Sequence, residues 1–575
     1  MTYLTAQTKN LGNDEGDVLS FFQNKMRNLI QRNGGDNSFS WIMEEFKDKD
    51  APLPVGTKTR IKLTHSGHTI SQIEKGFSTI LLEFQVKLSE PVDVSADADN
   101  RLMKLFVGFK NAVEFYEDCR FWINGKLLDT YRQDELQRES FAYNSIQPRD
   151  AKATSKFSHS TWENVSQYSP SVCGCYIDLV DLADGQPHPF TIELTIPFID
   201  QLALQAWRLY PNSICGEIEE EVKTSLRAMV WCQVNPNVVK DTLQFLNDTP
   251  INEEIPAVIP ITRKFTQVGN PSNIVNEYKK VTPPEPTPTA EGEDTTPTTP
   301  SEPVLDEGAI AVKAGDATIS LKTKKLTLNV LNGTIQLGRS NLAGFGLKPG
   351  VYQGLVHELE TPLLIPSQEL TREIFEGSAK VNGLEISKSI PLRNATNITM
   401  MFPRTPTDIT CFENIMYQNV QLVVNKKTYP DTEFRDTCSA RFYQHQLIAN
   451  ELDGCLEATQ EFEDSFTQSL NDPVTGKRYT NCRSDGTSFG INFQLERSNA
   501  GYVFDGVDTG NNSVTVTFRG QPMYRGDDDT YFIPDLEHKE QHPPSPEAWV
   551  CQDSYFIWSV NGVEYHNDNV PVGYE

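Results

Sequence analysis

Apolar and polar residues alternate in short stretches along most of the chain. In Thr79–Val86 and Ile192–Phe198 an apolar residue stands at every second position. This period, in segments rich in β-branched and aromatic residues, predicts β-strands with one buried face. Alternating or continuously apolar stretches predict further strands at 61–63, 105–107, 120–123, 217–222, 228–234, 317–337, 384–390, 398–402, 420–424, 491–495, 514–518 and 555–560, the last followed by a polar tail.

One block of this pattern occurs twice. An apolar strand ends in Asn-Gly-Lys at 124–126 and in Asn-Lys-Lys at 425–427, an offset of 301 residues. In both places an aromatic residue, Phe141 or Phe442, follows 17 residues after the asparagine. The repeat therefore extends beyond a single strand.

Further segments keep the same order. Phe190–Ile196 matches Phe489–Leu495 at an offset of 299 residues. Apolar strands, Leu105–Val107 and Ile398–Phe402, precede the two repeated blocks. Similar blocks in the same order at the same spacing indicate a duplicated domain.

At 575 residues the chain is too long for one hydrophobic core. Each half carries around eight short strands, separated by long excursions such as Asp129–Ser171, which is the pattern of a jelly roll. The sequence therefore predicts an all-β fold of two tandem eight-stranded jelly rolls (β-sandwiches) with long loop insertions and a short N-terminal helix.

That helix is predicted at 17–32, where apolar residues form one stripe and the polar side is basic. The stripe consists of Leu19, Phe22, Met26, Leu29 and Ile30. Two interpretations remain open. The helix docks on its own domain, or it is a peripheral arm that contacts a membrane or a partner protein.

Residues 281–304 contain seven prolines and five acidic residues. Such a segment forms neither a ladder nor a core, so we expect it to be exposed, as an interdomain linker or a surface loop. The predicted domains are an N-terminal arm at 1–54, a first jelly roll at 55–280, this exposed segment with a β connector at 281–349, and a second jelly roll at 350–575.

The formal net charge is −27. An acidic surface repels phosphate, which excludes a protein that coats nucleic acid by neutralising its charge. A protein of this charge near a genome would enclose it, and no sequence-specific nucleic acid binding is expected.

Ten cysteines in 575 residues are too sparse for a disulfide-stapled scaffold. The first ten residues do not read as a signal peptide, and no apolar run approaches the roughly 18 residues of a membrane span. We therefore expect synthesis in a reducing compartment and a soluble product.

Short matches to catalytic and metal motifs fail in context. Gly486–Gly490 spells a nucleophile elbow around Ser488, but a strand follows where an elbow requires a helix. Cys173 and Cys175 are separated by one residue, whereas zinc sites use C-x₂₋₄-C with further ligands, so buried thiols are expected.

Histidines and acidic clusters give no stronger signal. The close histidine pairs, at 65/68 and 538/542, lack the His-rich strand of a jelly-roll metal site. Asp527–Asp529 offers the oxygens that Ca²⁺ prefers, yet it is typical of a solvated loop. The sequence predicts no catalytic, cofactor-binding or metal-binding residues, no cofactor and no enzyme activity.

Several short motifs, together with the tandem jelly rolls and the N-terminal arm, resemble those of one protein family. They are Phe402-Pro403, Thr428–Asp431, Phe493–Ser498, Gly501–Asp508, Pro543-Pro544 with Cys551–Tyr555, Leu209–Pro211 and Ile123–Lys126. The chain resembles the double jelly-roll (hexon-like) major capsid proteins of tailless icosahedral dsDNA viruses, in the form found in virophages and Polinton (Maverick) elements. The likeness covers residues 55–575, and the segment 281–304 departs from it.

This resemblance implies a structural virion protein whose homotrimers are pseudo-hexameric capsomers that tile an icosahedral shell around a dsDNA genome. It implies neighbouring capsomers, penton and minor capsid proteins as partners, and an internal membrane as a further candidate partner of the N-terminal arm. Synthesis would occur in the host cytoplasm, with assembly there or in the nucleus. Asp129–Ser171 and 281–350 are expected at outward towers or subunit contacts.

Two other classes remain open. A carbohydrate-binding or adhesion protein would show a row of aromatic residues, but the tryptophans at 122, 162, 207 and 231 lack strand spacing. The integrin tripeptide at 525–527 is a match that is common by chance. A jelly-roll glycan amidase would need acidic residues gathered between the sandwiches, which a sequence does not show.

Overall fold

A computed structural model of the chain describes its strands and the closest connections between them. The described residues are 39–48, 50–65, 67–92, 104–109, 112–132, 135, 138, 173–198, 209–233, 238–239, 258–259, 266–281, 309–314, 317–375, 384–403, 417–434, 470–471, 478–479, 491–495, 506–509, 512–522 and 545–566. The predicted helix at 17–32 and nearly all of the Pro/Thr-rich segment lie outside them.

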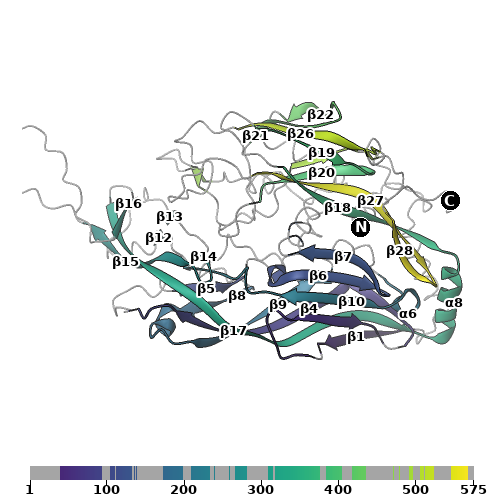
Figure 1. The fold of residues 1–575 in the computed structure, drawn as a ribbon, viewed down its shortest axis with the longest axis horizontal. Coiled ribbons are helices and arrows are strands. Elements are labelled where there is room, and N and C mark those ends of the chain that lie inside the picture. The colour runs from purple at the N-terminus through teal and green to yellow at the C-terminus, as the bar shows by residue number, and fades with distance from the viewer. Residues whose placement is uncertain are drawn as a thin grey trace, which may run out of the picture.

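The first unit is a sandwich of two main sheets (Figure 1). One has the order β1 (Phe39–Lys47), β17 (Ala317–Leu347), β4 (Thr69–Leu88) and β9 (His188–Pro197). The other has the order β3 (Lys58–Leu63), β10 (Ile218–Thr224), β6 (Tyr116–Ile123) and β7 (Lys126–Arg132). Counted in chain order, these strands read first-eighth-third-sixth and second-seventh-fourth-fifth, which is the order of a jelly roll.

The second unit repeats this order. One sheet runs β18 (Leu363–Ile374), β27 (Glu547–Ser559), β20 (Ala395–Met401) and β25 (Ile491–Gln494). The other runs β19 (Leu384–Pro391), β26 (Ser513–Pro522), β21 (Tyr417–Val424) and β22 (Lys427–Phe434). The predicted all-β fold of two tandem jelly rolls is confirmed.

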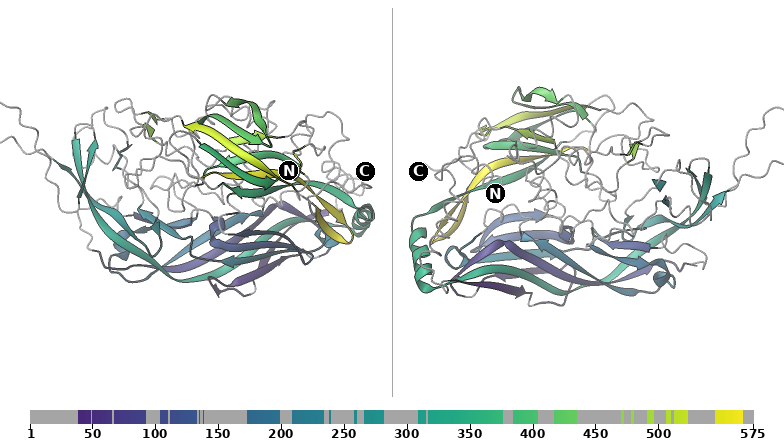
Figure 2. Two further views of the ribbon diagram at one scale, coloured as in Figure 1. Left: turned by 45° about the horizontal axis from the view of Figure 1, so that its top comes forward. Right: turned by 180° about the vertical axis from the view of Figure 1, so that it is seen from behind.

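The first unit carries additional strands. A third sheet has the order β14 (Thr266–Gln267), β11 (Val230–Gln233), β5 (Lys104–Gly108) and β8 (Gly174–Asp178). β2 (Leu53–Pro54), β15 (Pro271–Val281) and β16 (Ala309–Ala314) pair with β17, and the last two form with it the ribbon that projects from the unit in Figure 2. Two short pairs are β12 (Val238–Val239) with β13 (Val258–Ile259) and β23 (Leu470–Asn471) with β24 (Arg478–Tyr479).

Few helices are described. They are η2 (Ala112–Phe115), η5 (Leu179–Leu182), α6 (Asn212–Cys215) and α8 (Pro349–Leu359). Among the described residues no helix is long and apolar enough to cross a membrane.

The repeated asparagines form the same turn in both units. Asn124 and Gly125 have φ angles of 47° and 77°, and Asn425 and Lys426 have φ angles of 48° and 67°. Two successive positive φ angles make a type I′ hairpin, for which asparagine at the first position is favoured. The turns join β6 to β7 and β21 to β22, which are the fourth and fifth strands of their units.

Of the other two predicted matches between the halves of the chain, one agrees with the structure and one does not. Phe190–Ile196 lies in β9 and Ile491–Gln494 forms β25, both sixth strands, as a duplication requires. The match of Leu105–Val107 with Ile398–Phe402 is wrong, because the first lies in β5 of the third sheet and the second in β20 of a main sheet. A short apolar stretch carries no information on which sheet it joins.

Each unit has an apolar core between its main sheets. Strand alternation selects the buried faces, as in β3, where Ile61 and Leu63 are buried and the intervening lysine is exposed. The core of the first unit is the larger, and it also contains residues of the second unit, namely Ile365, Phe556, Trp558 and Val563.

The predicted domain boundaries stay a prediction. The structure adds that β1, inside 1–54, pairs along its length with β17, inside 281–349. Both are strands of the first jelly roll. The helix α8 spans the predicted boundary at 349/350 and leads into β18.

Candidate assembly site at the joint between the two units

The last hairpin of the chain connects the two units. The first half of β27 pairs with β20 inside the second unit, whereas Tyr555–Ser559 pairs with β28 (Gly562–His566). This hairpin reaches the end of the first unit beside α6 and α8 (Figures 1 and 2). From the sequence, only a last strand and a polar tail were predicted here. The overlooked signal is Asn561-Gly562, a dipeptide typical of hairpin turns.

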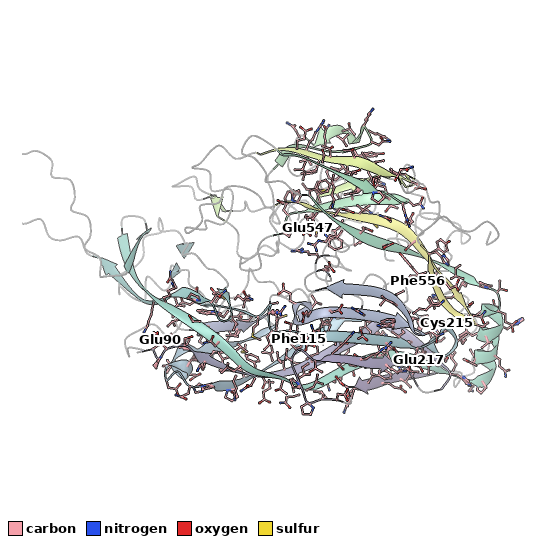
Figure 3. All side chains as sticks on the ribbon, viewed as in Figure 1. Glu90, Phe115, Cys215, Glu217, Glu547 and Phe556 are labelled. Carbon is pink, nitrogen blue, oxygen red and sulfur yellow. The ribbon has the colours of Figure 1, made fainter. Side chains whose placement is uncertain are left out.

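Trp558 is the central apolar residue of this contact between the two units, which we call the joint. Its side chain is buried, and its ring packs edge-on against Tyr210, with ring centroids 5.5 Å apart. Tyr210 is held by two backbone hydrogen bonds with Ser71 of β4, of 2.7 and 2.8 Å. Burying large aromatic side chains contributes most to such an interface. Figure 3 shows Phe556 and Cys215 on the two sides of this joint.

The I′ turn of the first unit lies at the rim of the joint. An ideal Cβ on Gly216 would be 2.7 Å from Asn124 Cβ, and one on Gly562 would be 3.4 Å from Asn124 Nδ2. Both glycines also have positive φ angles, of 117° and 118°. Lys126 Nζ lies 3.8 Å from Glu564 of β28, in an exposed ion pair.

The helix α8 also contributes to the joint, because it contacts both the core of the first unit and the last hairpin. Val351, Leu355 and Leu359 are buried in the core of the first unit. The backbone N–H of Val560 donates to the carbonyl of Leu359 over 3.3 Å, and the hydroxyl of Tyr352 donates to the carbonyl of Ser213 over 3.3 Å. The connection between the units is therefore packed against the first core.

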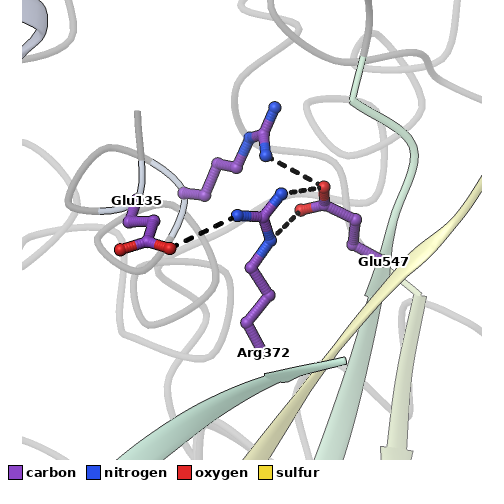
Figure 4. A network of polar contacts seen from close by, with 4 residues as sticks. Glu135, Arg372 and Glu547 are labelled. Carbon is purple, nitrogen blue, oxygen red and sulfur yellow. Dashed lines mark hydrogen bonds and ion pairs between the residues drawn. The ribbon is translucent and has the colours of Figure 1, made fainter. Parts of the chain in front are cut away.

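A cluster of charged residues forms a second contact between the units (Figure 4). The carboxylate of Glu547, which is buried, accepts from Arg372 Nη2 at 2.6 Å and Nε at 3.1 Å, and from Arg138 Nη1 at 2.9 Å. Glu135 lies 3.7 Å from Arg372. Glu135 and Arg138 belong to the excursion 129–171 that was predicted to lie at towers or subunit contacts. At these two residues, the excursion contacts the second unit of its own chain.

A buried carboxyl group links the two sheets of the first unit. Glu220 of β10 accepts hydrogen bonds from Ser78 of β4 at 2.6 Å and from Ser340 of β17 at 2.9 Å. Burial raises the pKa of Glu220 above its ordinary value, and the two serine hydrogen bonds offset part of that increase. The same burial raises the pKa of neighbouring Tyr116 well above its ordinary value.

The described candidates for metal chemistry have structural roles. His65 is buried, with Nδ1 3.1 Å from Ser71 Oγ and Nε2 2.8 Å from the carbonyl of Leu342, and His68 stacks on Tyr352. Cys173 is buried, and burial raises the pKa of Cys175 to about 12, so this thiol stays protonated. Within the part of the chain that the structure describes, no group of three or more His, Cys, Asp or Glu residues is placed to hold a metal ion.

The remaining candidates lie outside the described residues. They are Ser488 of the elbow match, the histidines at 538/542, the integrin tripeptide 525–527 and Asp527–Asp529. Glu220, Glu547 and Arg372 were not predicted from the sequence. The four glutamates of the predicted strand 217–222 were the available signal for the first, and no local signal marked the other two.

No family model matches the sequence, and no curated protein matches it. Solved structures do match. They include the cryo-EM structure of the Sputnik virophage (10% identity, TM-score 0.46, 94% of this chain and 90% of that chain), the mavirus major capsid protein (10%, 0.39, 91% and 90%) and the Faustovirus major capsid protein (9%, 0.38, 94% and 98%). The chain is similar to viral capsid proteins. At these identities no residue role is transferred, and the jelly-roll assignment follows from the strand order of the chain itself.

Proposed function

We propose that the chain is a structural major capsid protein. Three copies form a homotrimer, a pseudo-hexameric capsomer that tiles an icosahedral shell around a dsDNA genome. The observation that carries this proposal is the pair of jelly rolls with one strand order, held against each other by the shared core at the joint. A cyclic trimer of such a chain contains six sandwiches, and its nearly sixfold outline suits a hexagonal tile.

The negative charge of the chain favours a protein that encloses a genome over one that binds nucleic acid directly. A net charge of −27 opposes contact with phosphate groups. In this proposal the partners are neighbouring capsomers, penton proteins and minor capsid proteins. The basic side of the predicted helix 17–32 would contact a minor capsid protein or an internal membrane, and the mature location is the virion, after synthesis in the host cytoplasm.

The sugar-binding alternative receives no support from the tryptophans whose side chains are described. Trp231, Trp549 and Trp558 are buried. The ring of Trp122 is covered by the Arg60 guanidinium, 5.1 Å from the ring centroid. Three of these four rings are buried and the fourth is covered on one face by Arg60, so the four do not form an exposed aromatic row on which a sugar would stack.

The test is the mass of the purified protein by size exclusion with light scattering. A species near three times 64.8 kDa that resists dilution supports the capsomer, and imaging should then show a hexagonal outline. A monomer at all concentrations and salt conditions would contradict the proposal.

A further inference from the structure

The face of the first unit that receives the hairpin has a counterpart in the second unit. In the first unit, Tyr210 bridges to Ser71 of the third strand, β4, through two backbone hydrogen bonds. In the second unit, Val507 bridges to Ala395 of the third strand, β20, through the same two bonds, of 2.9 and 3.0 Å. Val507 therefore occupies the position that Tyr210 occupies at the joint.

The turns beside these bridges correspond as well. The backbone N–H of Asn124 donates to Glu217 at 2.9 Å, and that of Asn425 donates to Thr515 at 3.2 Å. Each acceptor lies at the seventh strand of its unit, just before β10 or within β26. By this correspondence Lys427 is the equivalent of Lys126, which pairs with Glu564 across the joint.

The two faces differ in what covers them. In the first unit, Tyr210 is buried by Trp558 of the second unit. In the second unit, Val507 is only half-buried and the turn 425–427 is exposed. Lys427 lies over its own Tyr429 ring, 4.8 Å from the centroid, and none of the described ion pairs involves Lys426 or Lys427.

The strand register shows which element of a second copy corresponds to the hairpin. Ala395 pairs with Gln552, and Trp558 follows six residues later. Ser71 pairs with Gly344, and six residues later the chain enters the first turn of α8. The element of the first unit that matches Trp558 in position is therefore α8.

The charges of these two surfaces are complementary. The turn presents exposed Lys426 and Lys427, and the last turn of α8 presents exposed Glu358, with Glu360, whose carboxylate lies 2.9 Å from His357 Nδ1, just beyond it. The joint inside the chain has the same polarity, with a lysine of the turn facing a glutamate of the arriving segment. Opposite charges at such a rim set register and partner choice more than affinity.

We propose that the turn 425–427 and Val507 form the contact surface for a second copy of this chain, which docks through its α8. This inference rests on the proposed trimer and specifies one of its contacts. Each chain would use the hairpin contact once within itself and the equivalent contact once with its neighbour, which closes a ring of copies.

The test is a charge reversal with a charge-swap rescue. The double variant Lys426→Glu/Lys427→Glu should weaken association about tenfold for each contact, because two exposed attractions become repulsions. Adding Glu358→Lys and Glu360→Lys should restore association to within about threefold of the original protein. The matched control, Lys75→Glu/Lys325→Glu, places the same added charge on two exposed lysines elsewhere and should retain most of the parent's association.

A second measurement avoids variants. The unmodified protein, mixed from light and ¹⁵N-labelled copies, is treated with a carbodiimide that joins lysine to carboxylate. Mixed-isotope cross-links between 426–427 and 358–360 are expected. Assembly without these cross-links, or an unchanged double variant, overturns this contact and leaves the capsomer standing. A parent protein that never associates overturns both.

Discussion

At the scale of single residues, Glu220 makes stability depend on pH. Burial raises its pKa in the folded protein, so the folded chain keeps a proton that the unfolded chain releases. Stability contributed by this group is therefore complete below about pH 4.5, the ordinary pKa, and falls as pH rises through the folded pKa.

Replacing this carboxyl by an amide should remove the dependence. We expect Glu220→Gln to melt at a higher temperature than the parent at pH 8, and the difference to vanish below about pH 4.5. Calorimetry from pH 4 to pH 8 measures this. Glu193→Gln, at an exposed position of β9, is the control. A difference between Glu220→Gln and the parent that does not change with pH would contradict the assignment.

Substitutions at a second residue, Trp558, test whether its ring stabilises the joint. Truncation by Trp558→Ala removes a buried ring from the contact with Tyr210 and should destabilise the protein by about 3–5 kcal/mol. Trp558→Phe keeps a ring at the same place and should cost less. Denaturant unfolding distinguishes the two, and equal losses would show that the ring contact is not what stabilises the joint.

At the scale of elements, the equivalence of the two I′ turns can be tested by exchanging their second residues, which are glycine in the first unit and lysine in the second. Gly125 has a φ of 77° with open space around it, and Lys426 has a φ of 67°. Because a non-glycine residue is strained at such angles, Gly125→Lys should lose about 1 kcal/mol and Lys426→Gly should gain about as much. Urea unfolding of both variants checks the signs, and two changes of the same sign would contradict the equivalence of the turns.

These turns also show why part of the fold was predictable. An asparagine at a positive φ is a local requirement, so it appears in the sequence at both copies and its spacing reveals the duplication. The alternation in strands such as β3 is local in the same way. The hairpin signal at Asn561-Gly562 was also local and was overlooked.

The joint was not predictable, because its contacts join distant residues. Tyr210 meets Trp558, and Glu547 meets Arg138, across several hundred positions. No residue pattern near either partner specifies the other. The same limit explains the wrong match of Leu105–Val107, since sheet membership depends on long-range register.

At the scale of the whole molecule, the cluster around Glu547 couples the two units. Arg372→Met leaves the buried carboxylate with Arg138 alone, and we expect a loss of about 3 kcal/mol. Arg519→Met removes an exposed pair with Glu385, 3.0 Å apart, and should cost less than about 1 kcal/mol. Thermal or urea unfolding compares the two. Similar losses would mean that the cluster adds nothing beyond a surface ion pair.

Assembly itself must overcome the charge of the chain. Each copy carries −27, so copies repel one another, and added salt shortens the Debye length from about 30 Å at 0.01 M to about 10 Å at 0.1 M. Association of the parent should therefore strengthen over this range, although the proposed ion pairs between the turn 425–427 and α8 weaken slightly.

The double variant Lys426→Glu/Lys427→Glu lowers the net charge from −27 by four units to −31, and its association should depend more steeply on salt. Light scattering across a salt series measures both, and a parent trimer that dissociates as salt rises would show that attractive charges at the contacts outweigh the overall repulsion.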